Sequence, residues 1–388
     1  MLSKYINRMK REYSDRLSVL SNILRELSRA SVCDEVVAAS LQNQIIDIGT
    51  GLEEEYNLAG SPILNTLEKL ADSVFYLVDA TVAEEVRKNA YREIGMFAEG
   101  LESDWARSVD ENKCRMALVL IIKNEARYVK EWLEFHNMLG VEHFYIYDNE
   151  SEDDLKEVLR PYIEKGLVTY TLWPGDVVQV PAYNDAIKRY KYDTEYMGFI
   201  DTDEFLFPIE GMSIPDTIDS IIEKYNSYDA KVFRVGGIGV NWRSYGTSHI
   251  KQSPEGLVIE NYTLRGNDDY PANVHIKTVC IPALVREFQT NPHNVFYKDA
   301  LDATLSEHGS MIPAAFFYDG RCEILRINHY YTRSEEDLYY KMNKRRWPDA
   351  PKEVQDEWVK FYPKRLIECN DVEDHIMDRF IEPLKVRM

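Results

Sequence analysis

The 388-residue sequence has few cysteines and no long apolar run. Its five cysteines are scattered and form no CxxC pair, which argues against a zinc knuckle or a disulfide framework and fits a reducing compartment. No stretch of about 18 apolar residues occurs, so no transmembrane helix is predicted. The stretch MLSKYINRMKREYSDR is followed by no apolar segment, so we expect no signal peptide. We therefore expect a cytoplasmic protein, working in solution or peripherally at the inner face of a membrane.

Positive charge is also scarce. Lys and Arg number 46 against 66 Asp and Glu, which gives a net charge of −20. Such a surface repels nucleic-acid phosphates and anionic lipid headgroups, so a nucleic-acid partner is not expected. One local basic cluster, Lys341–Arg346, departs from this trend.

Residues 1–110 lack strand alternation and contain few glycines. Apolar residues recur there at spacings of three and four, which predicts an amphipathic helix; they are Ile6, Met9, Tyr13, Leu17, Leu20, Leu24 and Leu27. Later stretches of this region also predict helices. We expect a helical N-terminal region that either packs on the main domain or mediates self-association, and it contains no catalytic constellation.

The pattern changes near Met116, where short apolar runs begin to alternate with helical stretches. The runs MALVLII, HFYIYD, LVTYTLW and Tyr196–Ile200 predict strands, and the intervening segments predict helices, one of them opened by a capping box of Ser151 and Asp154. This alternation predicts an α/β fold with a mostly parallel sheet covered by helices on both faces. No GxGxxG follows the first strand, which disfavours a dinucleotide site.

Short β-like runs fill residues 231–333, namely KVFRV, GLVIENYTL, HIKTVCI and EILRINHYY. Residues 334–346 read as a helix, and the polar tail 347–388 is expected to be helical. The predicted organisation is a helical region 1–110, an α/β domain 114–346 and a C-terminal tail 347–388.

Polar clusters follow three of the predicted strands. KNE (Lys123–Glu125) follows the first, DNES (Asp148–Ser151) the second, and DTDE (Asp201–Glu204) the fourth. Ligands of parallel α/β sheets bind beyond the carboxyl ends of the strands, where these clusters would meet. The sequence therefore places a candidate site at this edge of the sheet.

The carboxylates of DTDE are the most informative cluster. If the segment is extended, Asp201 and Asp203 point to the same side. Two carboxylates on one side at a strand end can hold Mg²⁺ or Mn²⁺, which keeps open positions for substrate phosphates. A solvated turn at the strand end is the alternative interpretation.

These residues also carry a family resemblance. The stretch Ile121–Tyr170, followed by FIDTDEFLFP, VNWRSYGTSH, HIKTVCIP and INHYYTRSEEDLYYKMNKRR, resembles glycosyltransferase family 92, once labelled a domain of unknown function and related to family 2-like enzymes. The resemblance covers about Cys114 to Arg346. It implies a GT-A fold, a metal-dependent leaving group, inversion at the anomeric carbon and a UDP-sugar donor, with galactose as the sugar.

The resemblance also implies roles for single residues. Asp203 would bind the metal directly, and Asp201 would contact the ribose or reach the metal through water. His329 would complete the metal shell, with His293 as its rival. Arg333 would face the diphosphate, where related patterns have lysine, and it would keep that charge while adding a bidentate fork.

Other residues would surround the donor; they are Lys123, Asn124, Glu125 and Asp148 around the nucleotide, and Arg265 and Lys277 at the diphosphate. Trp242 is either a platform for a sugar or a core residue, and His249 in YGTSH is a candidate acceptor contact, although this motif is one residue shorter than the family's. His136, His143 and His308 are interpreted as structural or surface histidines.

Together these features predict a transferase that moves a sugar from a UDP-sugar to a saccharide or glycolipid acceptor. A cation would neutralise the departing diphosphate, and a carboxylate base would deprotonate the acceptor hydroxyl. Glu204, Asp268 and Asp269 are the candidates for that base. The alternatives are a nucleotidyltransferase, which would usually need a phosphate loop that IIKNEARY does not resemble, and a non-catalytic module that binds nucleotide sugars.

Overall fold

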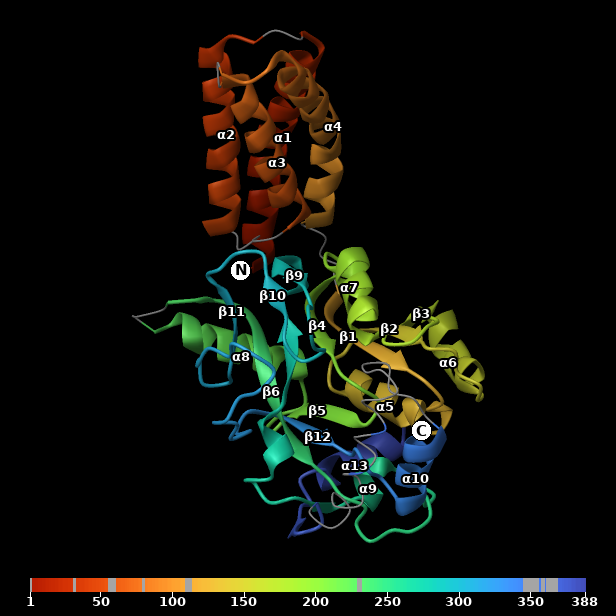
Figure 1. The fold of residues 1–388 in the computed structure, drawn as a ribbon. Helices are drawn as coiled ribbons and strands as arrows, with labels where there is room; N and C mark the ends of the chain where they lie inside the picture. The colour runs from red at the N-terminus through yellow and green to blue at the C-terminus, as the bar shows by residue number, and fades with distance from the viewer. Residues whose placement is uncertain are drawn as a thin grey trace. The chain divides into compact units, whose positions relative to one another are not determined.

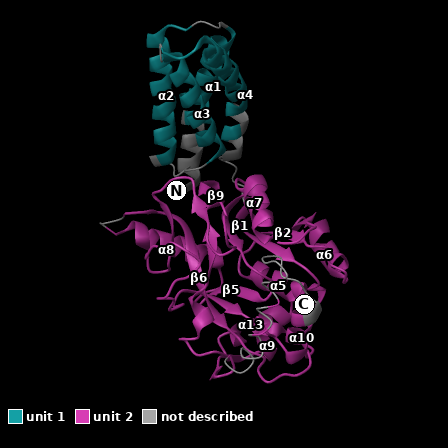
Figure 2. Cartoon of the chain, in the orientation of Figure 1, with its two compact units in different colours: residues 1–113 teal, residues 114–388 magenta. Residues whose placement is uncertain are grey.

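The computed structural model describes residues 2–30, 33–54, 61–78, 81–108, 114–228, 232–344, 356, 360 and 369–388. The chain divides into two compact units, Met1–Lys113 and Cys114–Met388 (Figures 1 and 2). Each has its own apolar core. Within the described residues, no helix combines the length and the apolarity that a membrane crossing requires.

The N-terminal unit is helical. Its described helices are α1 (Leu2–Ala30), α2 (Glu35–Glu54), α3 (Pro62–Val78) and α4 (Glu84–Ser108), with α3 packed between α2 and α4 and with α4 packed on α1. The predicted apolar stripe is buried from Tyr13 to Leu27, whereas the side chains of Ile6 and Met9 lie outside the described residues. The predicted helical character of this region is confirmed.

The second unit alternates strands and helices along its first half. Its main helices are α5 (Ala126–Met138), α6 (Leu155–Glu164), α7 (Gln179–Tyr190), α8 (Ile214–Asn226), α9 (Val258–Asn261), α10 (Glu335–Lys344) and α13 (Asp378–Lys385). The strands of its large sheet are β1 (Cys114–Ile122), β2 (His143–Asp148), β3 (Val168–Leu172), β4 (Thr194–Phe199), β5 (Glu204–Pro208), β6 (Arg234–Ser244), β8 (Ile276–Cys280), β11 (Asp302–Leu305) and β12 (Leu325–His329). Short pairs are formed by β9 (Val285–Glu287) with β10 (Phe296–Tyr297) and by β7 (Leu264–Arg265) with β13 (Val372–Glu373).

The large sheet has the order β3-β2-β1-β4-β8-β6-β12-β5, with β11 paired to β6. The first four strands are parallel, β8 runs antiparallel between β4 and β6, and β5 runs antiparallel to β12. The pairing of Gly198 with Val279 brings the start of β8 to the end of β4, so Lys277 comes beside the turn that follows β4. The predicted α/β class with a mostly parallel sheet is confirmed.

Alternate residues of β1 enter two different cores. Met116, Leu118 and Leu120 pack in a cluster with residues of α5 and α6, whereas Ala117 and Val119 pack with residues of α7. A strand that is apolar on both sides therefore carries helices on both faces, as the continuous run MALVLII predicts.

The structure differs from the predicted strand GLVIENYTL, and it describes only part of the C-terminal tail. GLVIENYTL was expected to be a strand, but Val258–Asn261 is a helical turn, because the Glu131 carboxylate accepts the N–H groups of Val258 and Ile259 at 2.7 and 3.1 Å and satisfies the donors of a helix start. Arg345, Arg346 and nearly all of 347–368 lie outside the described residues. The tail from 369 contains both β13 and α13.

Candidate active site

The DTDE segment is a tight turn between β4 and β5. The Glu204 N–H donates to the Asp201 carbonyl at 3.0 Å, and Thr202 and Asp203 form the turn. The extended geometry assumed from the sequence is therefore wrong, because this hydrogen bond reverses the chain. Asp201 and Asp203 accordingly find different partners.

Asp203 lies between a lysine and a histidine. Its Oδ2 is 2.6 Å from the Lys341 Nζ, and its Oδ1 is 3.6 Å from the His329 Nε2. Burial alone would raise the pKa of Asp203, but Lys341, His329 and Arg333 outweigh it and hold that pKa well below its usual value. Asp203 is therefore a carboxylate with one oxygen ion-paired and the other turned toward an imidazole.

His329 ends β12, opposite Glu204 in the register of β5. Burial lowers the pKa of His329 although Asp203 opposes the shift, so its imidazole is neutral near pH 7. A neutral imidazole beside a carboxylate is a suitable ligand pair for Mn²⁺.

Asp201, whose side chain is 33% exposed, belongs to a second polar group with the buried Lys277. Its Oδ2 is 2.9 Å from the Lys277 Nζ, and its Oδ1 accepts from the Gln179 Nε2 at 3.1 Å. Burial would lower the pKa of Lys277, but Asp201 and Glu204 outweigh it and raise that pKa above its usual value. Lys277 thus remains charged next to Asp201.

Glu204 is fully buried. Its Oε2 accepts the Asp201 N–H at 2.8 Å and lies 3.4 Å from the Lys277 Nζ, whereas its Oε1 has no hydrogen-bond partner among the described residues. Burial raises the pKa of Glu204 well above its usual value, although Lys277 opposes the shift. Glu204 therefore stabilises the turn from the protein interior. A carboxylate that takes the proton of an acceptor hydroxyl would need to be exposed.

The loops after β1 and β2 are tied together. The Asn124 N–H donates to the Ser151 Oγ at 3.0 Å, and the Ser151 N–H donates to the Asp148 Oδ1 at 2.9 Å. The capping box predicted for Ser151 and Asp154 is therefore wrong, because the Ser151 hydroxyl binds the neighbouring loop and Asp154 caps α6 without a side-chain hydrogen bond. Lys123 and Asn124 adjoin this junction, with Asn124 in a left-handed conformation at φ 54°.

Arg333 connects the first loop to the DTDE turn. Its Nη1 is 2.6 Å from the Glu125 Oε2, its Nη2 donates to the Thr202 carbonyl at 3.2 Å, and its guanidinium lies 3.6 Å from the centre of the Tyr128 ring. Burial would lower the pKa of Arg333, but Glu125, Asp203 and Tyr128 raise it above its usual value. The guanidinium expected to face a diphosphate is engaged with the protein, and it joins three parts of the site.

Trp242 on β6 is 8% exposed, and one of its ring faces stacks on His275 with centroids 4.8 Å apart. His329 lies 4.2 Å from the Trp242 ring and His293 packs edge-on against it at 5.3 Å. The structure thus places Trp242 among histidines and leaves little of its ring for a sugar. The acceptor candidate His249 is exposed in the loop after β6, in a left-handed conformation at φ 60°.

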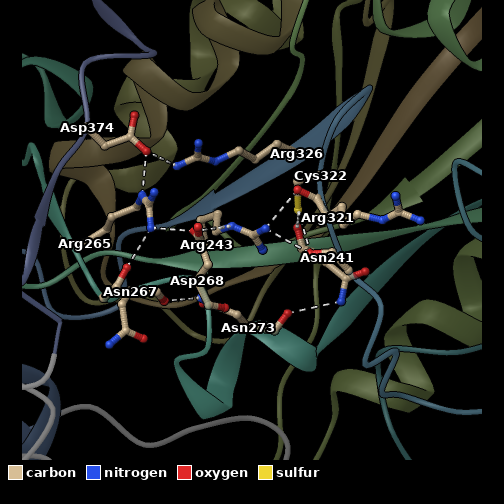
Figure 3. A network of polar contacts seen from close by, with 12 residues as sticks. Asn241, Arg243, Arg265, Asn267, Asp268, Asn273, Arg321, Cys322, Arg326 and Asp374 are labelled. Atoms are coloured by element: carbon tan, nitrogen blue, oxygen red, sulfur yellow. Dashed lines mark hydrogen bonds and ion pairs between the residues drawn. The ribbon is translucent and has the colours of Figure 1, made fainter.

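Arg265 and Asp268 belong to an arginine cluster (Figure 3). Arg265 pairs with Asp374 at 2.6 Å and with Asp268 at 2.9 Å, and Arg326 pairs with the same Asp374 at 2.7 Å. These ion pairs join β7 and β12 to the C-terminal segment. Asp269, next to Asp268, is exposed.

The structure also shows the contacts of the three histidines that were interpreted as structural or surface residues. His136 accepts the Leu206 N–H and is fully buried, His143 contacts Thr169, and His308 lies against Glu307 and Glu323. Lys341, Gln179 and Tyr183 were given no role from the sequence. The signal for Lys341 was present, because it lies in the one basic cluster of an acidic chain and four residues after Asp337, on the same helix face.

A divalent cation can be tested against these side chains. Asp203 Oδ1 and His329 Nε2 are 3.6 Å apart, close to the spacing of about 3 Å between adjacent ligands of an octahedral ion. Among the described residues, no set of three His, Cys, Asp or Glu side chains is arranged to hold a metal. Asp203 Oδ1 and His329 Nε2 are therefore the two side-chain atoms that a cation could use here, and the protein alone does not complete a metal shell among the described residues.

Comparisons with known proteins identify the family to which the chain is similar. The model of the family described as Glycosyltransferase family 92 matches residues 120–364. A glycosyltransferase family 92 protein of Ricinus communis is 31% identical over 156 residues, covering 40% of this chain and 27% of that protein. The galactan beta-1,4-galactosyltransferase GALS3 of Arabidopsis thaliana is 33% identical over 110 residues, covering 26% of this chain and 21% of that protein.

The chain therefore spans about a quarter of the length of these curated relatives. Among solved structures, the crystal structure of S. aureus TarS 1-349 in complex with UDP is 15% identical and covers 65% of this chain and 71% of its own. Its TM-score of 0.30 is too low to inform the position of any side chain.

Proposed function

The chain belongs to glycosyltransferase family 92, and we propose that it transfers a sugar, galactose in the first instance, from a UDP-sugar to a saccharide or glycolipid acceptor with inversion. The observation that carries this proposal is the pairing of Asp203 Oδ1 with the neutral His329 Nε2 at the end of the sheet. Family membership favours glycosyl transfer over nucleotidyl transfer. Surface polysaccharide or glycan synthesis at the inner face of a membrane would be the setting.

In this proposal Asp203 and His329 would hold Mn²⁺ or Mg²⁺, which acts as a Lewis acid on the departing diphosphate. The buried ammonium of Lys277 adds positive charge beside Asp201, where it would favour a phosphate anion. Glu125 ends the loop after β1 and Asp148 begins the loop after β2, and these two loops would receive the nucleotide. Arg333 keeps the first loop and the DTDE turn in register through Glu125 and the Thr202 carbonyl.

The acceptor hydroxyl must lose a proton to a carboxylate base as it attacks the anomeric carbon. Of the three candidates, Glu204 is fully buried and Asp268 is ion-paired with Arg265. Asp269 is exposed and has no ion pair among the described residues, so we favour it for this role.

Hydrolysis of a panel of UDP-sugars tests the proposal. We expect UDP-galactose to be cleaved slowly without acceptor when Mn²⁺ is present, and cleavage to stop with excess chelator. UDP-glucose and UDP-N-acetylglucosamine are the matched donors. Equal rates for all three would refute the donor assignment, full activity in chelator would refute the metal, and no cleavage or binding of any would refute the function. Once an acceptor has been identified, the anomeric configuration of the product shows whether the transfer inverts the anomeric carbon.

A further inference from the structure

Lys341 is the cation of this site that the proposed chemistry does not yet use. It is buried on α10, with its Nζ 2.6 Å from both the Asp203 Oδ2 and the Tyr331 carbonyl. The ammonium also lies 4.7 Å from the centre of the Tyr331 ring. Burying a lysine here is costly unless its charge is matched, and the charge it matches is that of a proposed metal ligand.

The helix that carries Lys341 is firmly placed. The Asp337 N–H donates to the Ser334 Oγ at 3.1 Å, and the Ser334 N–H donates back to the Asp337 Oδ2 at 3.2 Å, a reciprocal cap at the start of α10. The Tyr128 hydroxyl of α5 donates to the Asp337 Oδ1 at 2.6 Å, and Leu338 is fully buried. The cap and the packing of α10 therefore fix the position of Lys341 next to Asp203.

Three carboxylates in and beside the DTDE turn are paired with protein cations, and the fourth, Glu204, shares Lys277 with Asp201. Asp203 pairs with Lys341, Asp201 with Lys277 and Glu125 with Arg333, and all three cations are buried. A divalent ion approaching Asp203 without a nucleotide would meet a nearly neutral site and the repulsion of the Lys341 ammonium at short range. A diphosphate would bring two to three negative charges and reverse this balance.

We propose that Lys341 is the resident counter-cation of Asp203 and makes the binding of a divalent cation conditional on the diphosphate of the donor. Lys341 is then a positioning residue: it fixes Oδ2 so that Oδ1 faces His329, and it suppresses metal binding to the empty site. Because coupling between two ligands is reciprocal, the cation must strengthen nucleotide binding by the same factor. The proposal rests on the proposed function for the identity of the anion.

Calorimetric titration of the full chain with Mn²⁺, with and without saturating UDP, tests it. For the wild type we expect UDP to tighten Mn²⁺ binding at least about tenfold. Lys341→Met should tighten Mn²⁺ binding to the nucleotide-free protein by about tenfold, because it releases the Asp203 charge, and should shrink the effect of UDP. Lys341→Arg keeps the charge and should behave as the wild type. Lys188→Met, which removes an exposed lysine from α7, is the control for net charge.

Two results would overturn the proposal. One is a wild type that binds Mn²⁺ equally well with and without UDP. The other is a folded Lys341→Met protein whose nucleotide-free Mn²⁺ affinity equals that of the wild type. If Lys341→Met does not fold, Lys341→Gln replaces it, and the wild-type titration still decides. Failure of UDP to bind at all would count against the donor, whereas the nucleotide-free comparison of variants would still decide the role of Lys341.

Discussion

The two units of this chain bury different kinds of side chain. In the described part of the N-terminal helices, the buried polar side chains are the hydroxyls of Ser21, Ser61, Thr66 and Ser73. The second unit buries charged groups instead; they include Glu125, Glu131, Asp148, Asp203, Glu204, Arg243, Lys277, Arg326, Arg333 and Lys341. Because a buried charge is costly unless it is matched, the second unit must provide a partner for each of these groups, whether its role is structural or functional.

The largest effect is expected at Asp203. Asp203→Asn should lower UDP-sugar cleavage by about 100-fold or more, because the site loses a charge that stabilises the departing diphosphate through the cation. The matched control is Asp302→Asn on β11, a buried aspartate paired with Arg234 at 2.9 Å. The control should lose stability and keep its activity per folded molecule. Similar activity losses in both variants would mean that Asp203 acts through folding alone.

Arg333 tests the cost of the buried charges themselves. Arg333→Met removes the buried guanidinium that lies 2.6 Å from the Glu125 carboxylate and should lower the free energy of unfolding by about 3–5 kcal/mol. Arg189→Met removes an arginine with 46% side-chain exposure that pairs with Asp185 at 3.4 Å, and such pairs contribute only about 0–1 kcal/mol. Urea denaturation followed by tryptophan fluorescence measures both. Equal losses would contradict the view that matched burial holds this site together.

Two buried histidines are expected to have different roles: His329 binds the metal, and His136 supports the fold. His329→Ala should weaken Mn²⁺-dependent UDP binding by about tenfold or more and change the stability of the metal-free protein little. Both ring nitrogens of His136 bind backbone groups, the Leu206 N–H at 3.1 Å and the Trp132 carbonyl at 2.8 Å, so His136→Ala should lower stability by about 1–3 kcal/mol and leave UDP affinity intact. Unaltered Mn²⁺-dependent affinity in His329→Ala would exclude the ligand role and favour His293.

Sequence reasoning predicted the architecture well and the contacts poorly. The run MALVLII predicts a strand buried on both faces, and alternate β1 residues do enter two cores. Periodicity of three and four likewise predicts the buried face from Tyr13 to Leu27. These patterns are local, so a single segment contains the whole signal.

The missed features depend on partners that lie far along the chain. The helical turn at Val258 is held by Glu131, 127 residues earlier, and Asp203 is paired with Lys341, 138 residues later. The Ser151 hydroxyl binds the Asn124 N–H, 27 residues before it, and so does not cap its own helix. A spacing rule within one segment cannot find such contacts, since the sheet order decides which loops meet.

The buried Glu131 makes the stability of the second unit depend on pH. Burial raises its pKa to about 7 from 4.5, although two backbone N–H groups oppose the shift. Between these values the folded state keeps a proton that the unfolded state releases, so this group's contribution to stability is full below pH 4.5 and is lost as pH rises through 7.

Glu131→Gln should therefore remove that pH dependence, and it should be less stable than the wild type at pH 5, because the amide offers one acceptor oxygen where Glu131 presents two oxygens to the Val258 and Ile259 N–H groups. Denaturation between pH 5 and 8 measures it. Glu164→Gln, an exposed glutamate at the end of α6, should leave the pH profile unchanged. A wild-type profile retained in Glu131→Gln would assign the dependence to another group.

The smallest effect on catalysis is expected from removing the N-terminal helices. These helices have their own apolar core and, among the described residues, no buried charge. A truncation that starts at Asp110 should keep UDP-sugar cleavage within about twofold, because a unit with its own core can fold alone. Light scattering on both proteins then decides between the two expected roles. A fall in the number of subunits would assign self-association to the helices, and a monomeric truncation with lower stability would assign packing. Loss of activity in a folded truncation would show that the helices contribute to the site, and an unchanged assembly, stability and activity would show that they do neither job.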